Sequence, residues 1–331
     1  MKKLLIWLPG MLSMLAACTE AVEIPARAPE KQSPVRVELH LTTEQQAATR
    51  AMDENCIRDV NLYLYGDTEY HFYFPSVSSP LVFNVLPGNY RSYAIANAGQ
   101  DLGDKNAFKI QFYETAVDVM VSSDAIPMTD RGTLAVDGAG RCTPSSLRVT
   151  RSAAKIAYTI EVADAVAPSL RLRSVQFCNL PLTIRPFDSG SISSTVEANY
   201  YDGEAMPVGN ERRTAGTAYL FENLQGSVDT ITDQKDKCPE NAPSCATYLR
   251  ILAERSTDKA LVEYIVYPGE NNTSDFNVRR NTWHNLELVI MGENEIDNRV
   301  LVYDGLYYGT ANCHICTGDQ VTFDVTPYRT S

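Results

Sequence analysis

Residues 35–41 read Val-Arg-Val-Glu-Leu-His-Leu, and residues 58–67 read Arg-Asp-Val-Asn-Leu-Tyr-Leu-Tyr-Gly-Asp. In both stretches the aliphatic residues occupy every second position. Because successive side chains of a β-strand point to opposite faces, this alternation predicts two strands that each turn one face toward a core. The folded part of the chain is therefore expected to begin with β-structure.

The rest of the chain continues in the same manner. Short apolar or alternating segments recur between turn residues, and the expected strands are 81–85, 90–98, 146–150, 153–162, 171–178, 217–221, 246–253, 260–267, 284–291, 299–303 and 320–326. A helix is expected only over residues 106–119. Runs of strands with few helices are typical of β-sandwiches and not of parallel α/β sheets. The sequence predicts an all-β fold with a minor helix.

A turn-rich stretch, Gly-Ala-Gly-Arg-Cys-Thr-Pro at 138–144, divides these strands into two groups. The length of 331 residues also suits two domains, at about 150 residues each. We expect an N-terminal β-sandwich domain over residues 35–143 and a C-terminal β-sandwich domain over residues 144–331.

The first residues have the pattern of an export signal over 1–17. Lys2 and Lys3 precede an apolar run too short to span a bilayer, and the run ends in Leu-Ala-Ala directly before Cys18. This ending is similar to a bacterial lipobox, in which the cysteine sulfur receives a diacylglycerol; an ordinary signal peptide with a chance cysteine is the alternative. Residues 18–34 contain three prolines and few apolar residues, which is typical of a tether between lipid and protein.

The segment between the first two strands, residues 42–58, is long and polar and contains Thr49-Arg50-Ala51. A polar loop with an arginine followed by a small residue is a good substrate for an Arg-specific protease. A plain surface loop is the alternative interpretation.

Charge and motif content exclude several classes of function. The net charge of −12 leaves no surplus of Lys and Arg to neutralise phosphates, so nucleic-acid binding is not expected. The four histidines are scattered, and no nucleophile elbow or phosphate loop is visible. We therefore expect no enzymatic activity, no cofactor and no catalytic metal.

The eight cysteines are an even number, but lipidation of Cys18 would leave seven, so at least one thiol stays free in a monomer. Cys238 with Cys245, and Cys313 with Cys316, are close enough in sequence for two local disulfides, which an exported compartment permits. A zinc site built from the same four thiolates is the alternative.

The order of these features resembles the fimbrillins, the subunits of the lipoprotein-exported type V pili of Bacteroidales. That order is a lipobox, a tether, an alternating strand, a loop with Arg-Ala and a second alternating strand. Further segments similar to the family are RSYAIANAGQDLG (91–103), AAKIAYTIEV (153–162), SVQFCNLPL (174–182), AYLFENLQG (218–226), ATYLRILAE (246–254) and PGENNTSDFNVRRNTWHNLELVI (268–290). The last is the most specific. The likeness covers roughly residues 1–292.

The resemblance implies two transthyretin-like β-sandwiches in tandem and a precursor carried to the outer membrane as a lipoprotein, with palmitate-type acyl chains on Cys18. It also implies that an Arg-specific surface protease cuts between Arg50 and Ala51. The cut would release the first strand, 35–41, whose inward side chains are Val35, Val37, Leu39 and Leu41.

The groove left by that strand would accept a strand from a neighbouring subunit, and such head-to-tail exchange does not close on itself and yields a filament. Family shaft subunits donate a C-terminal strand. The candidate here is 320–326, in which Val321, Phe323 and Val325 alternate with polar residues. Completion of the chain's own C-terminal sandwich by this strand is the alternative. The tail from 298 onward, with Cys313 and Cys316, departs from the family pattern.

The expected function is that of a structural fimbrial subunit that supports adhesion at the cell surface. Its partners would be other subunits, the protease, the outer membrane before maturation, and a host protein or glycan. A pilus anchor that retains lipid and first strand is one alternative, and a tip adhesin is another. A surface glycan-binding lipoprotein unrelated to pili is the third.

Overall fold

The computed structural model describes residues 32–43, 55–107, 109, 115–116, 126–187, 193–210, 212–292 and 300–303. By its internal contacts the chain divides into two units, residues 1–33 and 34–331. Only Gln32 and Ser33 of the first unit are described, so the fold below is that of the second. None of the helices in the described ranges has the length and apolar character needed to cross a bilayer.

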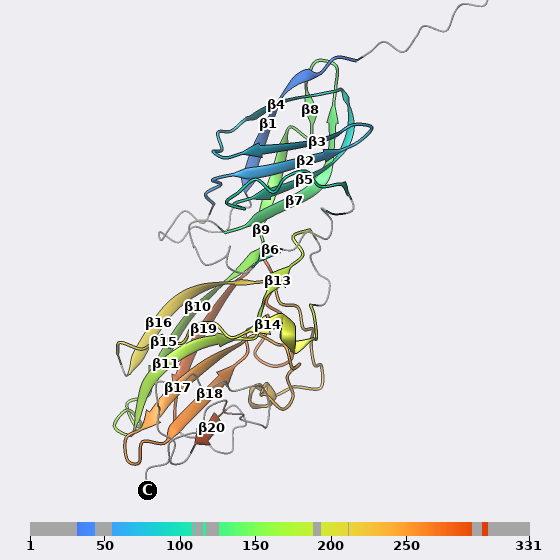
Figure 1. The fold of residues 1–331 in the computed structure, drawn as a ribbon. Coiled ribbons are helices and arrows are strands. Elements are labelled where there is room, and N and C mark those ends of the chain that lie inside the picture. The colour runs from blue at the N-terminus through green and yellow to red at the C-terminus, as the bar shows by residue number, and fades with distance from the viewer. Residues whose placement is uncertain are drawn as a thin grey trace, which may run out of the picture. The chain divides into compact units, whose positions relative to one another are not determined.

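Strands make up nearly all of the regular structure (Figure 1). They are β1 (Val35–Thr43), β2 (Val60–Tyr65), β3 (Glu69–Phe74), β4 (Leu81–Val85), β5 (Gly88–Ala96), β6 (Thr115–Ala116), β7 (Met128–Val136), β8 (Cys142–Thr143), β9 (Ser146–Arg151), β10 (Ala153–Val162), β11 (Leu170–Cys178), β12 (Leu180–Pro181), β13 (Thr183–Ile184), β14 (Tyr200–Tyr201), β15 (Met206–Pro207), β16 (Arg213–Phe221), β17 (Tyr248–Arg255), β18 (Leu261–Val266), β19 (Trp283–Ile290) and β20 (Val300–Tyr303). Two 3-10 turns, η2 (Glu197–Asn199) and η3 (Gln234–Asp236), complete the described elements. The predicted all-β class is confirmed.

The first set of strands follows the order β3-β2-β5-β7-β9-β1-β4, with β8 on β7. The alternating aliphatic side chains of these strands meet in one core, to which β2 contributes Val60, Leu62 and Leu64. The other face of β2 is buried as well, and it carries Tyr63 and Tyr65. Their hydroxyl groups donate to backbone carbonyl oxygens of the loop that follows β5.

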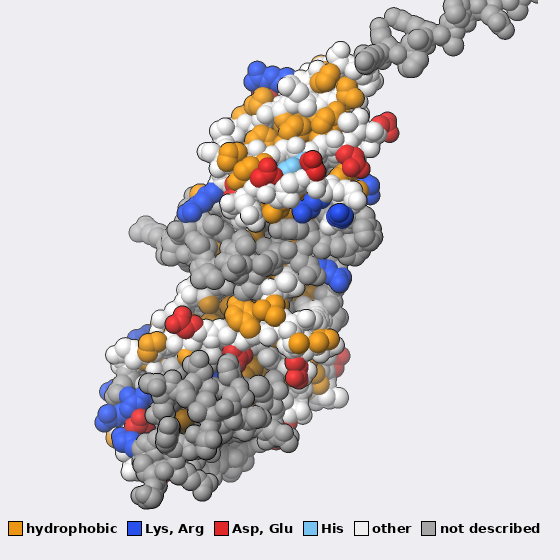
Figure 2. Space-filling model, viewed as in Figure 1, with side chains coloured by type: hydrophobic (Ala, Val, Ile, Leu, Met, Phe, Trp, Pro, Cys, Tyr) orange, Lys and Arg blue, Asp and Glu red, His pale blue; other side chains and the backbone are white. Residues whose placement is uncertain are grey.

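Aromatic side chains line the region between the edge strands β3 and β4. The inward residues of β3 are Tyr70, Phe72 and Phe74, and all three are partly buried. The ring of Phe72 lies 4.9 Å from that of Phe83 on β4. Figure 2 shows a row of hydrophobic side chains on the surface over this region.

The second set forms a three-stranded sheet, β16-β10-β19, and a five-stranded sheet, β15-β11-β17-β18-β20. Both sheets contribute to one core, which includes Ile156, Tyr158 and Ile160 of β10 and Leu249 and Ile251 of β17. Two sheets around a shared core are the arrangement of a β-sandwich.

Most expected strands are present with bounds that differ by a few residues, whereas β3, β7 and the two-residue strands β6, β8 and β12–β15 were not expected. The strand at 146–151, expected to open the second domain, pairs with β1 and β7. The change from one set of sheets to the other therefore falls after Arg151, and the domain boundary at 143/144 stays a prediction. Most of the expected helix at 106–119 lies outside the described residues, and its Thr115–Ala116 form β6.

We expect Ile156→Ala to lower the free energy of unfolding by about 2–5 kcal/mol, because the fully buried side chain leaves a cavity in the second core. Thr159→Ala on the outer face of the same strand is the matched control, with an expected loss below about 1 kcal/mol. Denaturant unfolding of both variants measures the difference, and equal losses would contradict the assignment of the core face.

Candidate functional site: the seat of strand β1

Strand β1 changes neighbours halfway along its length. Val35–Leu39 pair antiparallel with Leu81–Val85 of β4, and His40–Thr43 pair parallel with Ser146–Val149 of β9. Within the described part of the chain, each β1 residue thus has a ladder partner on one side only. A strand held in this way has about half the ladder of a central strand that is bonded from both sides throughout.

Side-chain burial also holds β1 in place. Val37 and Leu39 are fully buried in the first core, and Val35 and Leu41 are partly buried against it. A fully buried aliphatic side chain contributes about 1.5–3 kcal/mol, so Val37 and Leu39 together contribute about 3–6 kcal/mol. Loss of β1 would open an apolar groove between β4 and β9.

The turn between β7 and β8 closes against the start of β1. The Asp137 carboxylate accepts hydrogen bonds from the backbone N–H groups of Ala139 and Arg141, each at 2.9 Å. Gly140 has a φ of +79°, and a Cβ added there would lie 2.1 Å from the carbonyl oxygen of Arg36. Only glycine fits this contact without displacing β1 or the turn.

The segment after β1 leads to the expected cleavage site. Residues 44–54 lie outside the described part, as do Cys18, Arg50 and Ala51. The chain is described again from Asn55, whose side-chain oxygen accepts a hydrogen bond from Arg151. Arg151 is buried and also donates to Asn281. Asn55 is therefore held to the fold by a contact that does not involve β1.

The sequence Asn97-Ala98-Gly99 reinforces this attachment. The Asn97 side chain donates to the carbonyl oxygens of Cys56 and Ile126 and accepts from the N–H of Arg58. Asn97 and Gly99 have positive φ values, of 61° and 72°. This local geometry explains why an Ala-Asn-x-Gly type of ending follows β5.

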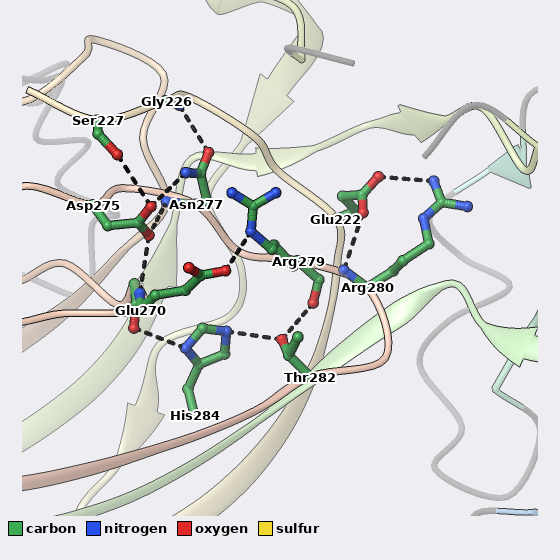
Figure 3. Close-up of polar contacts among 11 residues, drawn as sticks. Glu222, Gly226, Ser227, Glu270, Asp275, Asn277, Arg279, Arg280, Thr282 and His284 are labelled. Atoms are coloured by element: carbon green, nitrogen blue, oxygen red, sulfur yellow. Dashed lines mark hydrogen bonds and ion pairs between the residues drawn. The ribbon is translucent and has the colours of Figure 1, made fainter. Parts of the chain in front are cut away.

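A second polar cluster organises the loop between β18 and β19 (Figure 3). The Asp275 carboxylate accepts from the N–H of Glu270 at 2.9 Å, from the N–H and side-chain amide of Asn277, and from Ser227. Burial alone would raise the pKa of Asp275, but these hydrogen bonds outweigh it and lower the pKa below the usual range. The loop is thus built around an ionised, fully hydrogen-bonded carboxylate.

His284 closes the same loop from β19. Its Nδ1 lies 3.2 Å from the carbonyl oxygen of Gly269, and its Nε2 lies 3.0 Å from the Thr282 hydroxyl, which donates to the carbonyl oxygen of Arg279. Burial lowers the pKa of His284. This histidine is a buried structural residue rather than an exposed acid or base.

The adjacent arginines also have structural partners. Arg280 forms a buried ion pair with Glu222 at 3.0 Å and donates to the carbonyl oxygen of Pro186 at 2.6 Å. Arg279 pairs with Glu270 at the surface. The whole 268–290 motif thus encodes a loop framework, and it brings together no nucleophile, base and oxyanion donors.

The described thiols carry no disulfide. Cys238 and Cys245 are both free and buried, so the predicted Cys238–Cys245 disulfide is not formed in this structure. Burial raises the pKa of Cys245 and of Cys178, which keeps both thiols protonated. Cys313 and Cys316 lie outside the described residues, as do Val321, Phe323 and Val325 of the expected donor strand.

No metal site is found among the described residues, where no group of three or more His, Cys, Asp or Glu side chains is placed to hold an ion. Sequence reasoning missed the change of neighbours in β1, the Gly140 contact and the anchoring of Asn55 by Arg151. The Gly138-Ala139-Gly140 signal was visible, but it was interpreted as a break between domains.

Comparison with known proteins gives one family model, a domain of unknown function (DUF4906), over residues 218–288. No curated protein sequence matches the chain. A cell adhesion protein described as putative, from Parabacteroides distasonis, superposes with a TM-score of 0.55 at 11% identity, covering 82% of this chain and 98% of its own. A fimbrilin (FimA) from Porphyromonas gingivalis gives 0.54 at 14%, covering 81% and 95%. A similarly described cell adhesion protein from Bacteroides eggerthii gives 0.53 at 12%, covering 84% and 96%.

These likenesses place the chain in a class of all-β folds that also includes two proteins described as putative cell adhesion proteins and a fimbrilin. More narrowly, the chain has a fimbrillin-like fold, as the resemblance in its sequence predicted. The family model lies over the segment that contains β17, β18 and the loop of Figure 3.

We expect Gly140→Ala to destabilise β1, because the new Cβ meets the Arg36 carbonyl oxygen and the left-handed φ costs roughly 1–2 kcal/mol for a non-glycine residue. Hydrogen exchange of the β1 amides measures the effect, and it should become faster. Gly138→Ala is the matched control, since a Cβ there meets nothing within 4 Å. If the β1 amides exchange at the same rate in both variants, the turn does not hold the strand.

Stability should fall on acidification because of His284. Its folded-state pKa lies below the unfolded value of about 6.5, so below that pH the unfolded chain binds a proton that the folded chain excludes. The free energy of unfolding should decrease as the pH falls through 6.5, with a slope of up to about 1.4 kcal/mol per pH unit from this group. His284→Gln should flatten the slope relative to the parent protein, and an unchanged slope would contradict the assignment.

Proposed function

We propose that this chain is a structural subunit of a cell-surface fimbrium that supports adhesion. In this proposal it is exported as a lipoprotein attached through Cys18, cleaved between Arg50 and Ala51 by an Arg-specific protease, and polymerised by strand exchange. The fimbrillin-like fold supports the coarse assignment to fimbrial or adhesion proteins.

The mechanism rests on the way in which β1 is held in its sheet. The strand is held by ladder bonds on one side at a time and by burial of Val37 and Leu39. The proposed cut follows β1 directly in sequence, in residues 44–54. After that cut, nothing covalent joins β1 to β2, so its departure is opposed only by non-covalent contacts.

Strand exchange follows from what β1 would leave behind. The vacated groove offers the backbone edges of β4 and β9 and the apolar contacts of two fully buried side chains. A strand of alternating pattern from a neighbour restores both, which is the physical basis of β-strand addition. The candidate donor is 320–326, whose Val321, Phe323 and Val325 match the spacing of Val35, Val37 and Leu39.

The attachment of Asn55 supports the same sequence of events. Because Asn55 is held by Arg151, and Cys56 and Arg58 by Asn97, the cleaved chain would keep residues 55–58 in place. Cleavage then removes one strand without loosening β2. The cleaved subunit would remain folded with one open groove, as a polymerising subunit requires.

The test is N-terminal sequencing of the protein recovered from the cell surface, together with detection of high-mass polymers. We expect a terminus at Ala51 in the parent chain, and loss of both this terminus and the polymers in Arg50→Ala. Arg58→Ala is the matched control, since it removes a nearby arginine whose backbone N–H is already engaged by Asn97. The control should mature and polymerise normally.

An acylated terminus at Cys18 in both the parent and Arg50→Ala would contradict maturation by cleavage. That result would instead indicate a lipid-retaining anchor, in which β1 stays in its seat, or a non-pilus surface lipoprotein. Cleavage at Ala51 without any polymer would contradict the exchange step and point to a terminal subunit, such as a tip adhesin.

A further inference from the structure

The outward face of the β16-β10-β19 sheet follows from the alternation of its strands. Leu286 and Leu288 of β19 pack, partly buried, against the second core. The odd-numbered residues of the strand therefore point away from that core. All of them are exposed, and they are Trp283, Asn285, Glu287 and Val289.

One row across this face carries three large side chains. Lys155 of β10 lies opposite Tyr219 of β16 on one side and Trp283 of β19 on the other. The Lys155 ammonium lies 5.4 Å from the centre of the indole ring, which is within the range of a cation–π contact. Trp283 is nevertheless 50% exposed. A large apolar ring therefore stands in solvent on this face.

The sheet beside Trp283 forms a low floor. The next two rows carry only small side chains on β16 and β10 and polar side chains on β19. In order across the strands they are Thr217, Ala157 and Asn285, and then Ala215, Thr159 and Glu287. The indole thus stands at the border of a shallow surface that offers hydroxyl, amide and carboxylate groups.

The polar loop of Figure 3 fixes the backbone on both sides of Trp283. Thr282, which precedes it, donates its hydroxyl to the carbonyl oxygen of Arg279 at 2.6 Å, and its own carbonyl accepts from the N–H of Lys155 at 2.9 Å. His284, which follows it, is buried and lies 3.2 Å from the carbonyl oxygen of Gly269. The exposed indole is therefore held by a rigid support, as a preformed binding surface requires.

We propose that Trp283 and the floor beside it bind a neutral oligosaccharide. A sugar ring has an apolar face of C–H groups, which packs on the indole, and a rim of hydroxyl groups, which need donors and acceptors. The Asn285 side chain donates to the Glu287 carboxylate at 3.1 Å, so the two side chains lie together and offer both kinds of group. The small side chains of Ala157 and Thr217 leave room for the ring above the sheet.

The chemistry of this face favours a sugar over a protein or a charged polymer. The two floor rows carry no large apolar side chain, whereas the centre of a protein interface buries a cluster of them. The four charged residues on the face balance, with Lys155 and Arg213 against Glu161 and Glu287. A face without surplus charge provides no long-range attraction for an acidic polymer.

The site rests on the proposed adhesive function for its biological role, and it names the ligand class of that function. It lies on the second set of sheets, whereas the β1 groove belongs to the first. Binding to it requires neither cleavage nor a polymer, so it can be measured on the uncleaved chain.

Tryptophan fluorescence provides a direct test. The chain has two tryptophans, Trp7 and Trp283, so the full chain with Trp7→Phe reports on Trp283 alone. The probes are neutral oligosaccharides of glucose, galactose, mannose or N-acetylglucosamine, together with sialylated forms of those that contain galactose. We expect at least one neutral probe to shift the emission to shorter wavelength with saturation, because stacking removes water from the indole. Failure of every neutral probe, by fluorescence and by calorimetry, would overturn the proposal.

Point variants assign the binding to this face. Trp283→Ala should weaken binding of the active probe roughly tenfold or more in calorimetry, because the stacking surface is lost. Ala157→Phe should weaken it as well, since it fills the floor and leaves Trp283 in place. Val289→Ala, which removes another exposed apolar side chain of the same strand, is the matched control and should bind as the parent does. Equal affinities of Trp283→Ala and Val289→Ala would overturn the site.

Two further outcomes separate the ligand chemistry from assembly. Binding confined to the sialylated probes and lost at high salt would overturn the choice of a neutral ligand, because it would show attraction to a charge. A chain that polymerises but binds no neutral probe would overturn the sugar site alone. A chain that binds the probe but is never cut at Arg50 would contradict the fimbrial mechanism alone.

Discussion

The burial of two side chains, Val37 and Leu39, is the constraint on which the first half of this structure depends. β1 connects β4 to β9, so the sheet order β3-β2-β5-β7-β9-β1-β4 is continuous only while β1 is in place. Yet no β1 residue has ladder partners on both sides within the described chain. The backbone ladders thus specify where the strand lies, and burial of Val37 and Leu39 adds about 3–6 kcal/mol to its attachment.

Rigid attachments surround this weakly bonded strand. Asn97 and Arg151 fix the residues just before β2, and Gly140 brings a turn into contact with the start of β1. In the second half, Asp275, His284 and the Glu222–Arg280 pair fix the loop that sets the start of β19. Buried polar groups that are satisfied in this way define one geometry, because each would be costly to leave unpaired. The polar clusters described above therefore hold loops and turns in place. The distinctive surfaces of the described chain are its strand edges.

The sequence predicted the strands that alternate cleanly and missed those that do not. β1, β4 and β10 show period-two patterns that follow from one buried face, and β2 alternates in sequence although both of its faces are buried. The bounds of all four were close. β3 was missed because its aromatic residues lie on both faces, and β7 because its centre, Asp130 to Thr133, is mostly exposed. The register of β1 could not be predicted. The alternation of apolar and polar residues indicates which face of a strand is buried, but it does not indicate with which neighbouring strand it pairs. The role of Gly140 likewise depends on a carbonyl group over a hundred residues away.

The edges beside β1 and β19 differ in how they are covered. Between β4 and β9 the groove is filled by β1, whose Val37 and Leu39 are fully buried there. At β19 the edge is open in the described chain, with half-buried leucines and a hollow beside it. An exposed alternating edge invites uncontrolled pairing with other chains, and natural proteins cover such edges.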